Sequence, residues 1–437
     1  MRQFLKNTKL TALGMLFVIG ANAKDYRVAS AQEISALKLV PGDKVIMKAG
    51  DWKNQQIVFR GKGTAQQPIT LTTENPGKVV SSGNSTLKID GDYLIVDGLA
   101  FADGYSEKDA VVTFTKTSNN CRLTNSSIID YNHPDKDFHY TWVSLFGTRG
   151  QVDHCAFSGK AHQEPVLVVW LSDKPNYTQI DHNYFGPRPD LKANGGEIIR
   201  IGTSEWSMHD SYATVENNIF DSCNGETETV SIKSCYNKVL NNLFYECVGT
   251  LTFRHGNNSE ASNNYFIGNY IKNTGGIRVI GENHKVYNNY LYGIKGTGLR
   301  AAISLMNAYK NPELIKYWQV KNAVITDNVI VNCAVAIEIG SGKDSIRVMP
   351  PIGVILEENI VVNTPKLIVY NEKLENSIVK NNKEKGTDLI AGFESLKEDL
   401  VKSDGIYQVR GKEKTPFWMI EKIGPNWRKE NFEVQVK

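Results

Sequence analysis

Residues 217–254 read NNIFDSCNGETETVSIKSCYNKVLNNLFYECVGTLTFR and contain one pattern twice. NNIF returns as NNLF, and VSIK, which ends at Lys233, aligns with LTFR, which ends at Arg254. Both copies have the short apolar and polar alternation of strands and lack helical periodicity. A short unit that repeats at once along the chain is typical of a solenoid of stacked coils.

An asparagine followed by apolar residues recurs outside this stretch as well. The middle copies are 24, 22 and 25 residues apart, which fits one coil of three short strands, and longer gaps indicate inserted loops. Asparagine suits such turns because it tolerates a left-handed backbone, and its amide can bond the copies above and below. We predict an all-β parallel β-helix. The repeated asparagines are Asn183, Asn218, Asn242, Asn264, Asn289, Asn328 and Asn359.

The two ends of the chain differ from the repeats. Residues 34–52 predict a short helix, a Pro-Gly turn and a strand with Val45 and Met47 on one face, which would cap the solenoid. Residues 393–402 predict a C-terminal helix, and a capping segment from about 385 to 437 is expected to cover the open end of the stack. Two inserted segments, 186–193 and 307–318, are expected to wall a groove, the second partly as a helix.

Residues 1–23 combine a cationic start, a short apolar core and a small-x-small ending, the pattern of a signal peptide. The protein is therefore expected to be exported, to the periplasm or the medium, as a single domain over residues 24–437. No later apolar run is long enough for a membrane span. A net charge of +3 argues against a nucleic-acid surface, and we expect a monomer. The six cysteines are expected to be mostly buried free thiols, with Cys155 replacing a turn asparagine.

Cations recur once per unit through the middle of the chain. If the units stack at about 4.8 Å, they form a ladder along which a polyanion could lie. Each cation alone is more simply a solvated surface residue, and only their common phase marks them out. They are Arg200, Lys233, Arg254, Arg278 and Arg300.

Glu226 and Glu228 share strand parity and point the same way. Asn194 is expected beside them on the adjoining coil. Three oxygen ligands without histidine or thiolate favour a hard cation, and Ca²⁺ is the natural choice. Glu228 and Lys233 have opposite parity, so a bend or bulge near Thr229 is required if both face the same site.

This set of residues suits β-elimination in a uronate polymer. A cation that neutralises the sugar carboxylate makes the C5 proton more acidic, and Lys233 can accept that proton. Arg254 would steady the carboxylate or protonate the leaving oxygen, directly or through water.

The order of asparagine, ExE, lysine and arginine resembles polysaccharide lyase family 6, which contains alginate lyases and the dermatan-specific chondroitinase B. The resemblance covers nearly all of the mature chain and includes PGDKVIMKAGDW, YLIVDGLAF, DHNYFG, NGGEIIRIG and FRHGNNS. It implies a right-handed parallel β-helix without the second β-helix of the larger members. It implies these roles: Ca²⁺ ligands Asn194, Glu226 and Glu228, with Asn217 as a fallback; base Lys233; acid Arg254; and substrate contacts by His255, Arg278 and Arg300.

The NGGEIIRIG motif is more similar to the alginate lyases, so alginate is the expected substrate. Dermatan sulfate is the alternative, because a cation ladder could also bind sulfate. A non-catalytic glycan-binding β-helix would tolerate loss of Lys233. A pectin-type glycosidase would need aspartates as acid and base, and is disfavoured by the lysine and arginine beside the acidic pair.

Overall fold

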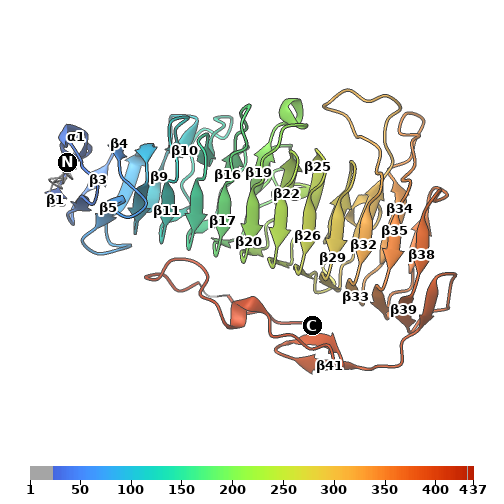
Figure 1. Ribbon diagram of the computed structural model, residues 1–437. Helices are drawn as coiled ribbons and strands as arrows, with labels where there is room; N and C mark the ends of the chain where they lie inside the picture. Colours follow the sequence, from blue (N-terminus) through green and yellow to red (C-terminus); the bar gives the residue numbers. More distant parts are fainter. Residues whose placement is uncertain (1–22, 431) are drawn as a thin grey trace, which may run out of the picture.

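The computed structural model describes residues 23–430 and 432–437, which form a parallel β-helix (Figure 1). Most coils contribute one strand in turn to each of three long sheets, named sheets A, B and C, and every strand pair in these sheets is parallel. The predicted all-β solenoid is confirmed. The predicted signal peptide lies, up to residue 22, outside the described residues. No helix within the described part of the chain is long and apolar enough to cross a bilayer.

Sheet A has fourteen strands, which line one side of every coil. They are β1 Asp25–Val28, β2 Lys44–Met47, β5 Ile69–Thr73, β8 Leu94–Asp97, β11 Arg122–Thr124, β14 Gln151–Asp153, β17 Gln179–Asp181, β20 Thr214–Glu216, β23 Lys238–Leu240, β26 Glu260–Ser262, β29 Lys285–Tyr287, β32 Val324–Thr326, β35 Ile355–Glu357 and β38 Ile378–Lys380.

Sheet B also has fourteen strands. They are β3 Trp52–Lys53, β6 Val80–Asn84, β9 Ala100–Tyr105, β12 Ser127–Ile129, β15 Ala156–Ser158, β18 Tyr184–Phe185, β21 Ile219–Asp221, β24 Leu243–Tyr245, β27 Tyr265–Ile267, β30 Tyr290–Tyr292, β33 Val329–Val331, β36 Ile360–Val362, β39 Asn382–Lys385 and β40 Phe393–Ser395.

Sheet C has twelve strands and carries most of the residues predicted to be functional. Its strands are β4 Gln56–Lys62, β7 Thr86–Asp92, β10 Ala110–Phe114, β13 Thr141–Leu145, β16 Leu167–Val169, β19 Ile199–Gly202, β22 Glu228–Lys233, β25 Thr250–His255, β28 Ile277–Val279, β31 Ile303–Met306, β34 Ile337–Ser341 and β37 Ile368–Tyr370.

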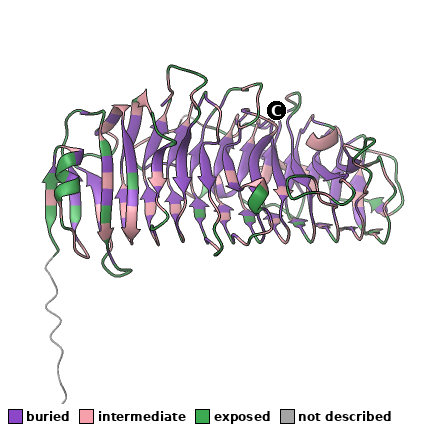
Figure 2. Cartoon of the chain, turned by 90° about the horizontal axis from the view of Figure 1, so that it is seen from above, coloured by how far each residue is buried: buried purple, intermediate pink, exposed green. Residues whose placement is uncertain are grey.

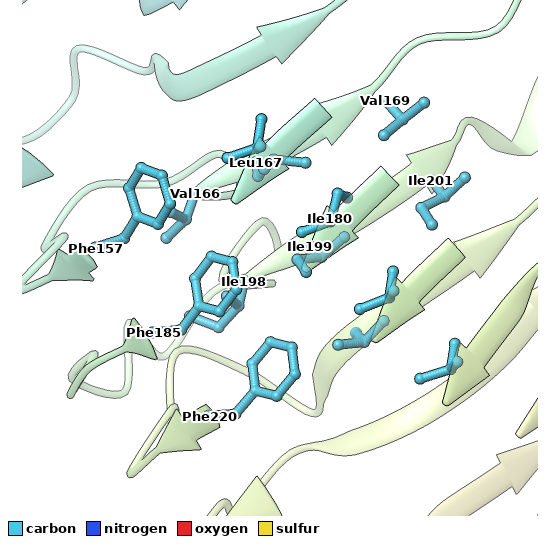
Figure 3. Packing of buried hydrophobic residues seen from close by; sticks show 14 of the residues in the cluster. Phe157, Val166, Leu167, Val169, Ile180, Phe185, Ile198, Ile199, Ile201 and Phe220 are labelled. Atoms are coloured by element: carbon cyan, nitrogen blue, oxygen red, sulfur yellow. The ribbon is translucent and has the colours of Figure 1, made fainter. Parts of the chain in front are cut away.

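The inward side chains of the three sheets form one continuous apolar core. Figure 3 shows its layering: Phe157, Phe185 and Phe220 come from successive strands of sheet B, while Ile199 and Ile201 come from sheet C. The phenylalanine rings stack with centroids 5.3 and 5.0 Å apart. Figure 2 shows this burial along most of the solenoid, with exposed residues concentrated at its N-terminal end and in loops.

The repeated asparagines form a hydrogen-bonded ladder at the corner between sheets A and B. The Asn218 amide nitrogen donates to Asn242 Oδ1 at 3.0 Å, and Asn242 donates to Asn264 in the same way. The predicted bonding between coils is confirmed, and the ladder extends to Asn382. The left-handed backbone lies one residue earlier than predicted, for example at Asn217, where φ is 54°.

The described cysteines are all buried free thiols, as predicted. Cys155 occupies the first position of the ladder, because its backbone N–H donates to Asn183 Oδ1 at 2.9 Å. The cysteine therefore continues the asparagine row, as its motif indicates.

The N-terminal cap has the predicted order of helix, turn and strand, but its helix begins three residues before the predicted stretch. Helix α1, Ala31–Ala36, begins after Ser30, whose side chain accepts a hydrogen bond from the Glu33 N–H. In strand β2, Val45 and Met47 are both fully buried.

The C-terminal prediction is wrong in two respects. Residues 393–402 form β40 and the start of β41, Leu400–Ser403, which pairs antiparallel with β42, Ile406–Val409, so there is no helix. The tail also does not cover the end of the stack. It runs back beneath the solenoid (Figure 1), where Phe417 of the 3-10 helix η3, Phe417–Met419, packs in an apolar cluster with outward residues of sheet B.

The reason is that sheet B presents apolar side chains outward as well as inward. Tyr184, Ile219 and Leu243 belong to the cluster that the tail covers. Burying this strip removes apolar surface from water, which favours docking of the tail on sheet B. The tail reaches as far as Asn125, whose backbone oxygen accepts from Trp427 Nε1 at 2.7 Å.

Candidate active site

Strand β22 is irregular at both ends of its pairing with β25. The register shifts between Glu228 and Val230, which confirms the bulge predicted near Thr229. A second shift follows Ile232, so that Lys233 lies opposite His255, and Arg254 is the extra residue on β25. The predicted pairing of Lys233 with Arg254 is therefore wrong by one residue. Bulges of this kind re-aim side chains.

The cations do not stand in one row, as the ladder required. Arg200 pairs with Ser231 rather than with Lys233, and Arg278 pairs with Thr252. Arg300 lies outside the sheet, in the 3-10 helix η2, Gly298–Arg300. The one-row ladder is a wrong prediction, because Arg200 and Arg278 stand two strand positions before Lys233, and Arg254 is a bulged residue. Arg254 and Arg278 nevertheless converge on one carboxylate.

That carboxylate is Glu228, which is buried. Its Oε1 lies 3.2 Å from Arg278 Nη1 and 3.5 Å from Arg254 Nε, and its Oε2 accepts from Ser231 Oγ. Both guanidinium groups also lie over the ring of Tyr317, at 4.3 Å for Arg254 and 5.2 Å for Arg278. The inserted segment 307–318 thus contributes a residue to the site. It contains turns and no helix, contrary to its prediction.

Glu197, Glu226 and Glu228 bring carboxylate oxygens within 4.8 Å of one another. Burial, followed by the charges of Glu197 and Glu228, raises the pKa of Glu226 to about 8. Glu197 Oε2 is buried and has no hydrogen-bond partner in the described part of the chain. Crowded, buried and incompletely bonded carboxylates fit a cation, and an all-oxygen set favours a hard one.

Glu197 is a residue of the site that the spacing of the cations does not indicate. Glu197 precedes β19. Ile199 pairs with Val230, and Glu197 lies two residues before Ile199 just as Glu228 lies two residues before Val230. Superposing EIIRI on ETVSI places Glu197 opposite Glu228. Superposing Arg200 on Lys233 instead places Asn194 opposite Thr227, between the two predicted glutamate ligands.

Asn194 lies at the edge of this centre. Its side chain is exposed, and it lines a hollow of about 490 Å³ together with Glu226, Arg300 and Asp190 of segment 186–193. Arg300 donates to Val248 O at 3.2 Å and Thr227 Oγ1 at 3.0 Å, which fixes its guanidinium at the rim.

The fallback ligand Asn217 is wrong. It lies at the corner between sheets A and B, where its side chain bonds Asn241 and His182. The acidic trio is on sheet C and in the segments that lead into it. Asn217 belongs to the structural turn and not to the site.

Lys233 and His255 lie beside the trio. Lys233 Nζ is 3.5 Å from Glu197 Oε1, and its side chain is 16% exposed. Burial and the charges of Arg254, Lys233 and Arg278 lower the pKa of His255 to about 3, so its imidazole is neutral. His255 Nε2 lies 2.9 Å from Arg254 Nη1 and can accept from it.

Two further arginines border the centre. Arg200 lies 3.6 Å from Glu164 and 5.4 Å above the ring of Trp170. Arg188, which the sequence analysis did not single out, is buried and donates to the Glu197 backbone oxygen at 2.6 Å. Burial lowers the pKa of Arg188 to about 10, so it stays charged beneath the carboxylates.

The family model described as Chondroitinase B matches residues 28–414. Among solved structures, the PL6 family alginate lyase AlyGC is 36% identical with a TM-score of 0.86. The alignment covers 94% of this chain and 59% of AlyGC, so this chain spans less than two thirds of that protein.

A mannuronic acid specific polysaccharide family 6 lyase from human gut microbiota is 32% identical, with a TM-score of 0.82 over 93% of this chain and 97% of that one. The PL6 lyase Pedsa3628 from Pseudopedobacter saltans is 27% identical, with a TM-score of 0.77, over 92% of this chain and all of that one. No curated protein matches the chain.

Proposed function

Because the chain belongs to polysaccharide lyase family 6, we propose that it cleaves alginate by β-elimination and leaves 4,5-unsaturated uronate ends. The observation that carries the proposal is the packing of Lys233 and two arginines against three crowded carboxylates on one face of sheet C. A base, fixed cations and a cation site are what proton abstraction beside a carboxylate requires.

Lys233 is the base in this proposal. In its neutral form the amine takes the C5 proton of the uronate, and the carboxylate of Glu197 holds the side chain at the rim of the acidic trio. Its partial burial keeps water from competing for the proton.

Arg254 is the bulged residue next to His255, the residue opposite the base, and its guanidinium lies over the ring of Tyr317. It stabilises the charge that develops on the substrate carboxylate, or transfers a proton to the leaving oxygen through water. Neutral His255 adds no charge of its own, so it can bond a sugar hydroxyl while orienting Arg254.

Glu226 and Glu228 are proposed to hold Ca²⁺ with Asn194, and Glu197 is added here as a further ligand. A bound Ca²⁺ would neutralise the substrate carboxylate. The bare Oε2 of Glu197 and the raised pKa of Glu226 support this assignment. Arg200, Arg278 and Arg300 are proposed to bind other carboxylates of the polymer.

The second candidate substrate is dermatan sulfate, because the matching family model is that of chondroitinase B. The cations around Glu228 could pair with sulfate as well as with carboxylate. We also propose export through residues 1–23, and action of residues 24–437 as one monomeric domain. The support for export is the charged and apolar pattern of the leader.

The test is near-ultraviolet absorbance of the unsaturated product, measured for residues 24–437 with alginate and separately with dermatan sulfate. Polymannuronate is the first alginate fraction to assay, since one relative is mannuronic acid specific. A rise on alginate that a chelator suppresses and Ca²⁺ restores is expected. A rise on dermatan sulfate alone would move the substrate and keep the chemistry. Binding of alginate without any rise would favour a non-catalytic glycan-binding protein.

A further inference from the structure

Two aromatic side chains continue the row of Lys233 along sheet C, toward the N-terminal end of the solenoid. Phe146 follows β13 and donates its N–H to Phe114 O at 3.1 Å, and Trp170 follows β16 and donates to Leu145 O at 2.9 Å. Since Val169 pairs with Ile201, the next residues in the row are Phe146, Trp170, Gly202 and Lys233. In Figure 1 the strands β10, β16, β19 and β22 follow one another in this order.

The two rings stack on each other with nearly parallel planes. Their centroids are 5.3 Å apart and their planes differ by 4°, while Trp170 Nε1 donates to Ser144 Oγ at 3.2 Å. Both side chains remain half-buried, so part of their surface faces solvent. Arg200, a residue of the candidate site, lies over Trp170 at 5.4 Å. The aromatic pair is therefore continuous with the site.

A hollow of about 680 Å³ opens beside the pair, over the coils of β4, β7, β10 and β13. Its floor includes Val58 and Thr113, and its rim includes Lys88 and Lys108, both exposed. Neither lysine has an ion-pair partner among the residues that the structure describes. Asp109 is the acidic residue of the lining.

These groups match the surface of an acidic sugar chain. The C–H faces of a pyranose are apolar and pack on aromatic rings, whereas its hydroxyl and carboxylate groups need polar and cationic partners. Strands lie about 4.8 Å apart, so Trp170 is about 10 Å from Lys233, and Lys88 on β7 is about 24 Å away along the axis. One polymer could span both places, but a short oligosaccharide bound at Lys233 could not.

We propose that this hollow is a distal subsite for the acidic polysaccharide, with the stacked pair Phe146 and Trp170 as its aromatic contacts to the sugar and Lys88 and Lys108 as its carboxylate contacts. The inference rests on the proposed function for the identity of the polymer. It assigns to the N-terminal coils of sheet C the role of holding a long chain while its scissile bond lies at Lys233.

The test compares polymer with trisaccharide in three variants of residues 24–437: Phe146→Ala, Trp170→Ala and the double variant Lys88→Gln/Lys108→Gln. Phe146→Ala should raise KM for polymeric alginate about tenfold, equivalent to about 1.4 kcal/mol, with kcat unchanged. The lysine variant should raise it about fivefold and reduce its dependence on salt. Trisaccharide turnover should not change in the lysine variant.

Lys285→Gln is the matched control, since Lys285 is exposed but lies on sheet A. The lysine variant changes two exposed side chains, so it answers the question even if an aromatic variant fails to fold. Unchanged polymer KM in the lysine variant, or an equal loss with trisaccharide, would overturn the subsite.

Calorimetric titration with alginate separates this proposal from the proposed activity. If the wild type eliminates nothing but binds the polymer, and the lysine variant binds it about fivefold more weakly, the subsite stands and the activity fails. If polymer is cleaved and bound equally by both proteins, the activity stands and the subsite fails.

Discussion

The asparagine corner and the outer face of sheet C are built from the same coils but satisfy their polar groups in opposite ways. At the corner, the amide of Asn242 donates to the next asparagine and accepts from the previous one. On sheet C and in the segment that leads into it, Glu197 Oε2, Arg278 Nε and His255 Nδ1 are buried without a partner among the described residues. A repeat can satisfy every polar group that it copies. Unpaired buried atoms also occur elsewhere in the described chain, for example at Ser81 and Tyr290, so it is their gathering around three crowded carboxylates that marks the site.

Lys233→Ala should give the largest effect, a loss of activity at the sheet C site with little change in stability. Loss of a general base is expected to reduce kcat by about 10²–10⁴-fold. The melting temperature should stay near that of the wild type, because Lys233 is at the surface of its coil. The measurement is product absorbance together with a thermal melt. Ordinary activity in this variant would show that another group takes the proton.

Asn264→Ala tests the asparagine corner. The change removes the acceptor of Asn242 and the donor to Asn289, which are buried. Leaving buried amides unpaired should lower the free energy of unfolding by about 3 kcal/mol. The measurement is urea unfolding, with activity per folded molecule as the second readout. A loss of kcat as large as that of Lys233→Ala would break the separation between the two regions.

Glu197→Gln tests whether Glu197, one of the residues with an unpaired buried atom, is a Ca²⁺ ligand. If Glu197 is a ligand, Ca²⁺ should raise the melting temperature of the wild type, and the variant should need at least about tenfold more Ca²⁺, equivalent to about 1.4 kcal/mol. Asp190→Asn is the control, an exposed carboxylate on the wall of the same hollow. Equal Ca²⁺ responses in wild type and Glu197→Gln would remove Glu197 from the metal site.

The smallest expected effect is on stability, through the contact between His182 and the tail. His182 bonds Asp181 at 2.8 Å and Glu421 of the tail at 2.7 Å, and these carboxylates raise the pKa of His182 above its ordinary value despite burial. A raised pKa stabilises the fold fully below about pH 6.5, and this contribution is lost as pH rises through the folded-state pKa. Glu216 also faces this cluster.

The stability advantage of wild type over His182→Asn should therefore be below about 1 kcal/mol and should shrink as pH rises above 6.5. Thermal melts of both proteins across that range measure it. An advantage that grows with pH would contradict the ion pair with Glu421.

The features that repeat could be predicted from the sequence, and the features that do not repeat could not. The period defines the solenoid, the asparagine ladder and the position of Cys155, because each coil copies its neighbour. Parity alone required the bulge at Thr229. The extra residue at Arg254 left no such sign, because LTFR matches VSIK in pattern.

The course of the tail could not be predicted for a related reason. FESLKEDLVK has helical composition, but Phe393 pairs with Asn382 on sheet B and Leu400 pairs with Val409. Its destination depends on an apolar strip that many coils form together, which no local pattern displays. Tertiary burial outweighs local propensity in such a segment.

The contact of Trp427 with Asn125 also has a consequence for the order of folding. Coils pack mainly on their neighbours, so the solenoid can assemble progressively as the polypeptide becomes available. The contact between Asn426 and Asn125 spans 301 residues and cannot form until nearly all of this sequence is present. The entropic cost of closing a loop grows only with the logarithm of its length, so the free-energy cost of this late contact stays modest. Docking of the tail is then the last event in folding. It ties distant coils together along a stack whose ends could otherwise fray.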